Sequence, residues 1–399
     1  MAIVNITSLA TNYFVMDMPD VQWTNLTAGD KYSVQVTITP LNGAVVQFTE
    51  TYVADTSGAV TLRGLAELLQ PYVKPSPTEL TSINLSTTST VLVTVTRATV
   101  ALQLYDDETP ANTVGPNKLC YVYYSNQRTD TYPGSMKHWL SRYTERTLYR
   151  KQRVIASAFY FSGVSAKMVV HYVPEDTVVT NQMTPNIPSA TAATPPTDAF
   201  VLAYRLEDIA TAIGQGCTKD NIKIVDLQLL DGNTVKDTIR FRVDRGKIAN
   251  HRIVAFTNCY GMFETEVFAG TDEQSDSMDG EYSWIDNAYE KIAEEMVLEH
   301  KLCAGHVTDE QRRSIRDIAR SPKVAIVYKG EGSVLAPAAY EPMTVTAIDI
   351  TDKDPHTEPQ TAYVTLRHAP RHHEVVSRGS GSASYDDGIF DYTFDDSYN

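Results

Sequence analysis

The sequence has few of the residues that build compact chemical sites. It has four cysteines in 399 residues, at Cys120, Cys217, Cys259 and Cys303, and no Cys-x-x-Cys pair. This scatter argues against a disulfide scaffold or a zinc finger. It predicts buried thiols in a reducing compartment, so we expect synthesis in a cytoplasm.

Basic residues are also scarce. Thirty-four Lys and Arg stand against 49 Asp and Glu, giving a formal net charge of −15. General nucleic-acid binding needs a basic face, and docking on an anionic membrane needs one too, so this charge balance argues against both. No apolar run approaches the roughly 18–20 residues of a membrane helix, and residues 1–20 lack the pattern of a signal peptide. High net charge favours solubility at high concentration, as a protein made in many copies requires.

Motifs for catalysis are absent. The sequence contains no Gly-x-Ser-x-Gly elbow, no Ser-x-x-Lys motif and no Walker phosphate loop. We therefore expect a protein that is not an enzyme, with no catalytic residues, no cofactor and no metal.

Two weak metal patterns have simpler explanations. His368, His372, His373 and Glu374 lie close together, but Pro370 interrupts any shared helical face, so a solvated strand end is favoured over a zinc site. Residues 272–286 place Ser275, Ser277, Asp279, Gly280 and Asp286 where a calcium loop has ligands. Two of the first three side chains carry no charge, so a solvated acidic loop, or one that docks to a basic partner, is favoured.

Alternating apolar residues predict a mainly β fold with α+β elements. In residues 1–135, Val34, Val36 and Ile38 have the period of a half-buried strand, and residues 62–72 have helical spacing. Residues 136–270 repeat this plan, with helical spacing at 206–213 and a hairpin over 222–243. We predict tandem β-sandwich-like modules, each crossed by a short helix.

The rest of the chain differs in composition. Residues 271–376 begin with an acidic insert, continue in a helical pattern from Trp284 to His300, and include a capping box at 308–311. With strands at 324–328, 343–350 and 362–368, they predict a C-terminal α+β module. Residues 377–399 form an expected flexible tail, acidic and aromatic, in which Tyr385, Phe390, Tyr392 and Phe394 are candidate contacts.

One basic cluster stands out in the acidic chain. Arg142, Arg146 and Arg150 have i,i+4 spacing and would form a basic stripe on a helix. Nucleic-acid contact is one hypothesis, since arginine and aromatic side chains serve it. Pairing with the protein's own acidic residues, or with those of a neighbouring copy, is favoured.

A turn motif carries the most specific pattern. Phe256, Asn258 and Gly261 precede Glu264, and a strand then leads to Gly270. Asn and Gly suit a tight turn with positive φ. With Ser321-Pro322, Pro342-Met343 and the early turn at 53–58, the stretch resembles virion structural proteins of tailed phages and prophages of Bacteroidota.

The resemblance implies a tail-associated structural subunit without catalytic residues. Its partners would be itself, as a homo-oligomeric ring or layer, and other virion proteins, with no membrane contact. The alternative is a tail-tip receptor- or glycan-binding protein, for which Trp23, Trp139 and Trp284 could form a stacking platform. Tail, baseplate and adaptor positions all stay open.

Overall fold

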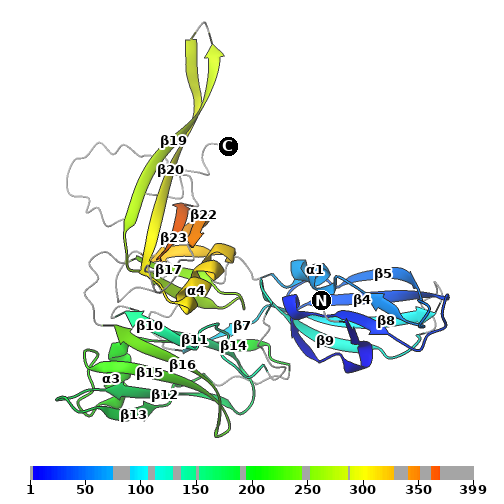
Figure 1. The fold of residues 1–399 in the computed structure, drawn as a ribbon, viewed down its shortest axis with the longest axis horizontal. Helices are drawn as coiled ribbons and strands as arrows, with labels where there is room; N and C mark the ends of the chain where they lie inside the picture. The colour runs from blue at the N-terminus through cyan, green and yellow to red at the C-terminus, as the bar shows by residue number, and fades with distance from the viewer. Residues whose placement is uncertain are drawn as a thin grey trace, which may run out of the picture.

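The computed structural model shows three β-rich bodies along the chain, from which one long hairpin projects (Figure 1). It describes residues 3–74, 90–106, 113–128, 136–149, 152–188, 195–244, 252–285, 288–327, 340–350 and 361–368. The fold is mainly β, as predicted, with a few short helices. No helix among these residues combines the length and the apolarity that crossing a membrane requires.

Module 1 is a sandwich of a five-stranded and a three-stranded sheet. The large sheet has the order β2-β9-β8-β4-β5 and the small one β1-β3-β6. Helix α1 and both sheets share one core, which includes Trp23, Val34 and Leu69. The strands are β1 (Ile3–Asn5), β2 (Asn12–Phe14), β3 (Asp20–Trp23), β4 (Lys31–Pro40), β5 (Val46–Val53), β6 (Val60–Leu62), β8 (Arg97–Asp106) and β9 (Lys118–Tyr123); the helices are η1 (Ile6–Ser8), η2 (Val15–Asp17), α1 (Leu65–Leu69) and η3 (Gln70–Tyr72).

Module 2 has the same plan. Its large sheet has the order β10-β16-β15-β12-β13, and β11-β14-β7 forms the small one. Helix α3 and the two sheets enclose a core around Trp139, Phe200 and Ile209. The elements are β7 (Thr90–Thr94), β10 (Glu145–Tyr149), β11 (Val154–Phe159), β12 (Val164–Tyr172), β13 (Val179–Met183), β14 (Asp198–Tyr204), α3 (Leu206–Ile213), β15 (Ile222–Asp231) and β16 (Thr234–Asp244).

The strand pairings confirm the predicted tandem plan. The outer strand β2 runs parallel to β9, as β10 does to β16. The remaining pairs of both large sheets are antiparallel. In module 1 they are β9-β8, β8-β4 and the hairpin β4-β5; in module 2 the corresponding pairs are β16-β15, β15-β12 and β12-β13. In each small sheet a helix follows a strand that pairs antiparallel with its neighbour. Helix α1 follows β6, which pairs with β3, and helix α3 follows β14, which pairs with β11.

One strand crosses between the modules. β7 precedes β8 of module 1 in the chain, yet it pairs antiparallel with β14 of module 2, with Val93 opposite Ala199. Module 1 therefore extends the small sheet of module 2 by one strand, which ties the two bodies through main-chain hydrogen bonds.

The C-terminal module is one antiparallel sheet of seven strands, β18-β17-β21-β22-β23-β20-β19, with helix α4 packed beside it. The strands β17 and β18 of this sheet lie before residue 270. The module therefore begins at Arg252 and not after residue 270, where the boundary was expected. The boundary expected near residue 135 falls in a stretch outside the described residues. The elements are β17 (Arg252–Thr257), β18 (Phe263–Phe268), β19 (Asp272–Ile285), β20 (Ala288–His306), α4 (Asp309–Arg320), β21 (Val324–Val327), β22 (Tyr340–Ile350) and β23 (Thr361–His368).

The helix predicted from Trp284 to His300 is wrong. This stretch continues β19 and forms most of β20, and the two strands pair along their length as a hairpin. Alanine, glutamate and methionine favour helix locally, but pairing with β19, and with β23 from Glu299 onward, overrides that preference. The same pairing excludes a calcium loop at Ser275, Ser277, Asp279 and Gly280, which lie in β19; Asp286 lies outside the described residues.

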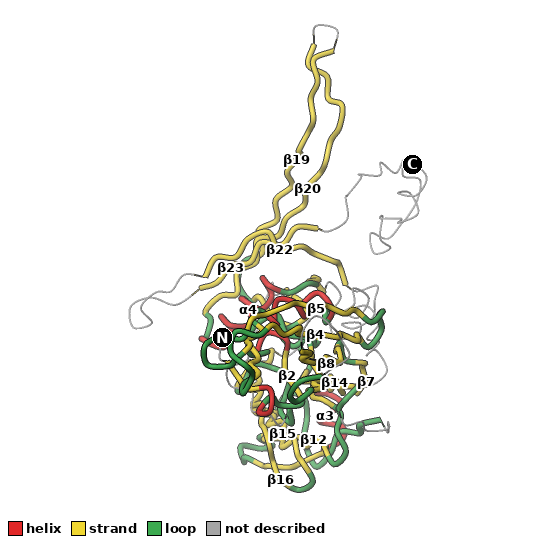
Figure 2. Tube along the Cα trace, turned by 90° about the vertical axis from the view of Figure 1, so that its right-hand side faces the viewer, coloured by secondary structure: helices red, strands yellow, loops and turns green. Residues whose placement is uncertain are grey.

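The hairpin of β19 and β20 is the most prominent feature of the outline. Figures 1 and 2 both show it extending away from the rest of the molecule. Only its root joins the sheet, since β20 pairs with β23 between Glu299 and His306. We call residues 276–298, beyond that pairing, the arm.

The two small sheets differ in what covers their outer faces. In module 1 the strands β3 and β6 alternate between buried and partly exposed residues, such as Gln22 and Thr61 on the outside. In module 2 every residue of β11 is buried, because Ile155 and Val201 pack on Ile253 and Val267 of the C-terminal sheet. A continuous apolar run therefore marks the strand that is covered on both faces.

The predicted capping box at α4 is confirmed. The Thr308 hydroxyl accepts from Gln311 N at 3.3 Å, and Gln311 Oε1 accepts from Thr308 N at 3.1 Å.

Thr308→Ala should destabilise the first turn by about 1 kcal/mol, and so speed amide hydrogen exchange there about fivefold. Thr308→Ser, which keeps the hydroxyl, is the control and should exchange at the wild-type rate. Equal exchange in all three proteins would contradict this role of the cap.

Candidate functional site: a buried polar joint between the modules

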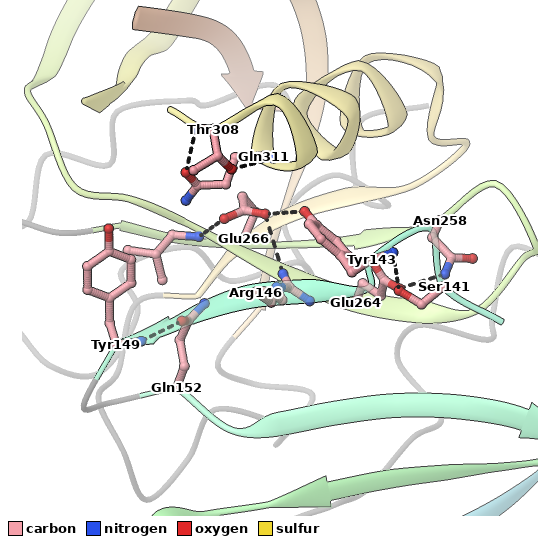
Figure 3. Close-up of polar contacts among 11 residues, drawn as sticks. Ser141, Tyr143, Arg146, Tyr149, Gln152, Asn258, Glu264, Glu266, Thr308 and Gln311 are labelled. Atoms are coloured by element: carbon pink, nitrogen blue, oxygen red, sulfur yellow. Dashed lines mark hydrogen bonds and ion pairs between the residues drawn. The ribbon is translucent and has the colours of Figure 1, made fainter. Parts of the chain in front are cut away.

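The centre of the molecule contains a buried ion pair between two modules. Arg146 lies on β10 of module 2 and Glu266 on β18 of the C-terminal sheet, with Arg146 Nη2 3.4 Å from Glu266 Oε2. Their side chains are only 5% and 3% exposed. Figure 3 shows both at the centre of a network that we call the module joint, made of Ser141, Tyr143, Arg146, Asn258, Glu264 and Glu266.

Further contacts satisfy this pair. The Tyr143 hydroxyl donates to Glu266 Oε2 at 2.6 Å, and the Arg146 guanidinium lies 4.5 Å from the centre of the Tyr143 ring. Glu266 Oε1 accepts from the backbone N of Val267 at 3.2 Å. Burial alone would lower the pKa of Arg146. Tyr143, Glu266 and Glu264 raise it by a larger amount, so the net shift is upward and the group stays charged. Burial, and then the Glu266 carboxylate, raise the pKa of Tyr143, which keeps its proton as a donor.

A second carboxyl group lies two residues away on the same strand. Glu264 is 5% exposed and accepts from Asn258 Nδ2 at 2.9 Å. Burial raises the pKa of Glu264, although Arg146 and the hydrogen bonds from Asn258 and Ser141 lower it in part. One arginine thus faces two buried carboxyl groups, and its loss would leave them uncompensated.

Asn258 positions the turn that the sequence singled out. Its side-chain amide donates to Leu140 O at 2.8 Å as well as to Glu264, and its oxygen accepts from the backbone N of Tyr260 and Met262 at 2.9 and 3.0 Å. Every polar atom of a buried amide is therefore paired, which is what burial at 2% exposure requires. The predicted turn is present, although only Gly261, and not Asn258, has positive φ. The turn fastens the 136–149 segment to the C-terminal sheet.

Gly261 brings module 1 against this turn. Its φ is +80°, and a Cβ at this position would lie 2.8 Å from Cδ1 of Tyr124, at the end of module 1. Beside it, Asn126 N donates to Cys259 O at 3.1 Å. The glycine is needed both for the left-handed backbone and for close approach of the Tyr124 ring.

Asp317 on α4 joins all three modules. Its carboxylate is 3.0 Å from Arg142 of module 2 and accepts from Gln127, which follows module 1. Burial raises the pKa of Asp317, while Arg142 lowers it in part. At the other end of α4, Glu310 accepts from the Thr144 hydroxyl at 2.7 Å and from Glu145 N at 3.0 Å.

The root of the arm has its own polar contacts. Asp272 Oδ2 accepts from Arg252 at 2.6 Å, and Asp272 Oδ1 lies 2.9 Å from Nδ1 of the buried His300. The His300 ring stacks on His368 with centroids 5.4 Å apart. Gly270 is required where the chain enters β19, since a Cβ there would lie 2.8 Å from Cys303 O and 2.9 Å from its Sγ.

The basic stripe predicted at Arg142, Arg146 and Arg150 does not form. The chain here is a bend followed by β10 and not a helix, so i,i+4 spacing does not align these side chains. Arg142 and Arg146 instead pair with Asp317 and Glu266 of the same chain, as the favoured hypothesis held. Arg150 lies outside the described residues.

Most of the other predicted site residues are not described by the structure. Tyr385, Phe390, Tyr392 and Phe394 fall outside the described residues, as do His372, His373 and Glu374. His368 is a buried residue at the end of β23 and not a solvated strand end. Among the described residues, no group of three or more His, Cys, Asp or Glu side chains could hold a metal ion. All four cysteines are buried thiols, as predicted.

Sequence reasoning missed the acidic half of the joint. Glu266 and Asp317 were not singled out, because acidic residues are abundant in this chain, and Glu264 entered only as a member of the turn motif. A signal was present: β18 places two glutamates among Phe263, Thr265, Val267 and Phe268, in a strand that the flanking apolar residues mark as buried. Carboxylates in such a strand need a buried cation.

Comparisons with known proteins give low similarity. No protein-family model and no curated protein matches this chain. A chain of a solved "Virion of native gene transfer agent (GTA) particle" matches 32% of this chain and 95% of its own length, at 13% identity and a TM-score of 0.21. A TM-score of this size does not show a shared fold, so the functional argument below does not use this similarity.

The raised pKa of Glu264 makes a pH-dependent contribution to stability. Because the folded protein holds this proton more tightly than the unfolded chain, stability is lost as pH rises from the unfolded pKa of about 4.3 through the folded value. Glu264→Gln removes that loss. Relative to wild type, the variant should gain free energy of unfolding between pH 4 and pH 8 in urea denaturation.

Glu266→Gln is the matched control. It leaves Arg146 without its direct partner and should cost about 3–5 kcal/mol at pH 7. A difference between Glu264→Gln and wild type that stays constant from pH 4 to pH 8 would contradict the assignment of the buried proton to Glu264.

Gly261→Ala tests the close contact with module 1. Gly29 has a similar φ of +86° but nothing within 4 Å of an added Cβ, so Gly29→Ala measures the backbone strain alone. That strain is about 1–2 kcal/mol. Gly261→Ala should cost more in urea unfolding, because the Tyr124 ring must move. Equal losses in the two variants would show that the ring contact contributes nothing.

Proposed function

We propose that this chain is a non-enzymatic structural subunit of a tailed-phage virion, in a tail, baseplate or adaptor layer. In this proposal it is synthesised in the host cytoplasm and assembles with copies of itself and with other virion proteins. The observation that carries the proposal is the arm, a long two-stranded extension of an otherwise packed sheet.

The arm has few partners within its own chain. From Asp276 opposite Leu298 to Ile285 opposite Ala288, the described strands pair only with each other. Ten residues of strand extend about 33 Å. A two-stranded ribbon alone is marginally stable in water, so packing against a neighbouring molecule would stabilise it. An extension of this kind suits a subunit that contacts its neighbours beyond its own body.

The module joint supplies what such a subunit also needs, which is a fixed shape. Arg146 with Glu266, Asn258 with Leu140, and Asp317 with Arg142 and Gln127 all connect different modules. Strand β7 adds main-chain pairing between modules 1 and 2. Several buried connections of this kind oppose hinge motion between modules and would present the arm in one direction.

Charge indicates the chemistry of the partner surface. The arm, residues 276–298, contains seven acidic residues and one lysine, in a chain of net charge −15. A basic surface on a neighbouring virion protein would complement the arm and steer its association. Nucleic acid would be repelled by the same charge.

The alternative, a tail-tip receptor- or glycan-binding protein, is less well supported. Trp23 and Trp139 are each 1% exposed and belong to the cores of modules 1 and 2. Two of the three tryptophans thus cannot form a stacking platform. The motif resemblance to virion structural proteins of Bacteroidota phages favours the structural role.

Shortening the arm tests the proposal. Met278 and Met296 face each other in the hairpin, so residues 279–295 can be replaced by Asn-Gly, which closes a two-residue turn and keeps the buried Val297. The variant should keep the wild-type melting temperature, because the module cores are untouched. It should fail to enter particles when it replaces the wild-type protein during phage production, as measured by mass spectrometry of purified particles.

A full-length control separates length from turn chemistry. Asn287→Gly keeps the whole arm and should be incorporated normally, since Asp-Gly also suits a two-residue hairpin turn. Particles that contain the shortened protein at the wild-type level would rule out assembly through the arm.

A further inference from the structure

The small sheet of module 2 ends in an open strand beside an apolar cavity. Its order is β11-β14-β7, and among the described strands β7 pairs with β14 alone. Leu92 and Val93 on β7 are only partly buried. An open edge strand offers a row of main-chain donors and acceptors to another extended segment.

The cavity runs along this edge. Its volume is about 300 Å³, and residues 91–96 all line it. Residues 91–94 belong to β7, and residues 95 and 96 follow it. Because successive strand residues point to opposite faces, a cavity lined by all four strand residues reaches the strand edge. Val201 of β14 also lines it, so the cavity borders a face of the sheet as well. Four aromatic residues also line the cavity, namely Tyr123, Tyr124, Phe159 and Tyr260. An edge strand with an apolar pocket beside it is the geometry of peptide binding by strand addition.

The chain contains a segment with the matching pattern. In residues 389–394, Phe390, Tyr392 and Phe394 alternate with Asp391 and Thr393. As a strand, this segment would place three aromatic rings on one face and polar groups on the other. It lies more than 20 residues beyond the end of β23 at His368, a connection that can span about 65 Å when extended.

We propose that residues 389–394 of a neighbouring copy add as a strand to the open edge of β7, with aromatic side chains in the cavity. The inference rests on the proposed self-assembling role for its choice of a neighbouring copy. It continues an interaction that the chain already uses, since β7 is itself a strand that module 1 adds to module 2. The tail then links adjacent subunits.

Peptide binding tests the docking site. A fluorescent peptide of residues 384–399 should bind a protein truncated after residue 376, and binding should slow amide exchange across residues 91–96. Phe390→Ala/Tyr392→Ala/Phe394→Ala in the peptide should weaken binding at least about tenfold, the effect of losing 1.4 kcal/mol. Asp391→Ala/Thr393→Ala/Asp395→Ala, in the other phase of the strand, should bind within about twofold of wild type.

The result that would overturn the site is absence of binding, or binding without protection of residues 91–96.

An experiment on the full-length protein tests whether the added strand comes from a neighbouring copy or from the same chain. Light scattering should show association that increases with concentration and is lost on truncation after residue 376. Monomers at all concentrations with residues 91–96 already protected would show that each tail binds its own chain, against the proposal. Failure of the peptide to bind leaves the arm experiment unaffected, so the two proposals can fail separately.

Discussion

The arrangement of the molecule depends on one buried cation. Arg146 is enclosed where module 2 meets the C-terminal sheet, and Glu266, Tyr143 and Glu264 surround it. Taking these charges out of water costs several kcal/mol for each ion, and the cost is recovered only in a closely defined geometry. The net stabilisation that the pair supplies is therefore small, although removal of one partner would be costly.

The contacts around this pair convert three separate cores into one support for the arm. Asn258 and Gly261 connect the turn after β17 to modules 2 and 1, and Asp317 does the same from α4. The apolar contact of Ile155 and Val201 with Ile253 and Val267 lies beside them. Polar contacts thus determine how the modules are oriented at the interface, and burial of apolar side chains supplies most of the free energy that holds them together.

The sequence predicts local elements well where pattern and tertiary context agree. Alternation at Val34, Val36 and Ile38, the spacing at 206–213 and the Thr308 capping box all correspond to observed elements. The strand β20 was not predictable in this way, because its helix-forming residues are held extended by pairing with β19 and β23. The sequence favoured pairing of Arg146 with an acidic residue, but its burial and its partner Glu266 were not predictable, because a strand 120 positions away leaves no local signal.

Two surfaces distinguish this chain from a packed monomer, namely the arm and the open edge of β7. Both are extended backbone at the margin of a sheet, and both would be completed by another protein. The most direct test is cryo-electron microscopy of purified particles that contain this chain. The account predicts repeated copies in a symmetric layer, with each arm buried against a neighbour. Particles that lack the protein, or copies whose arms contact only solvent, would contradict it.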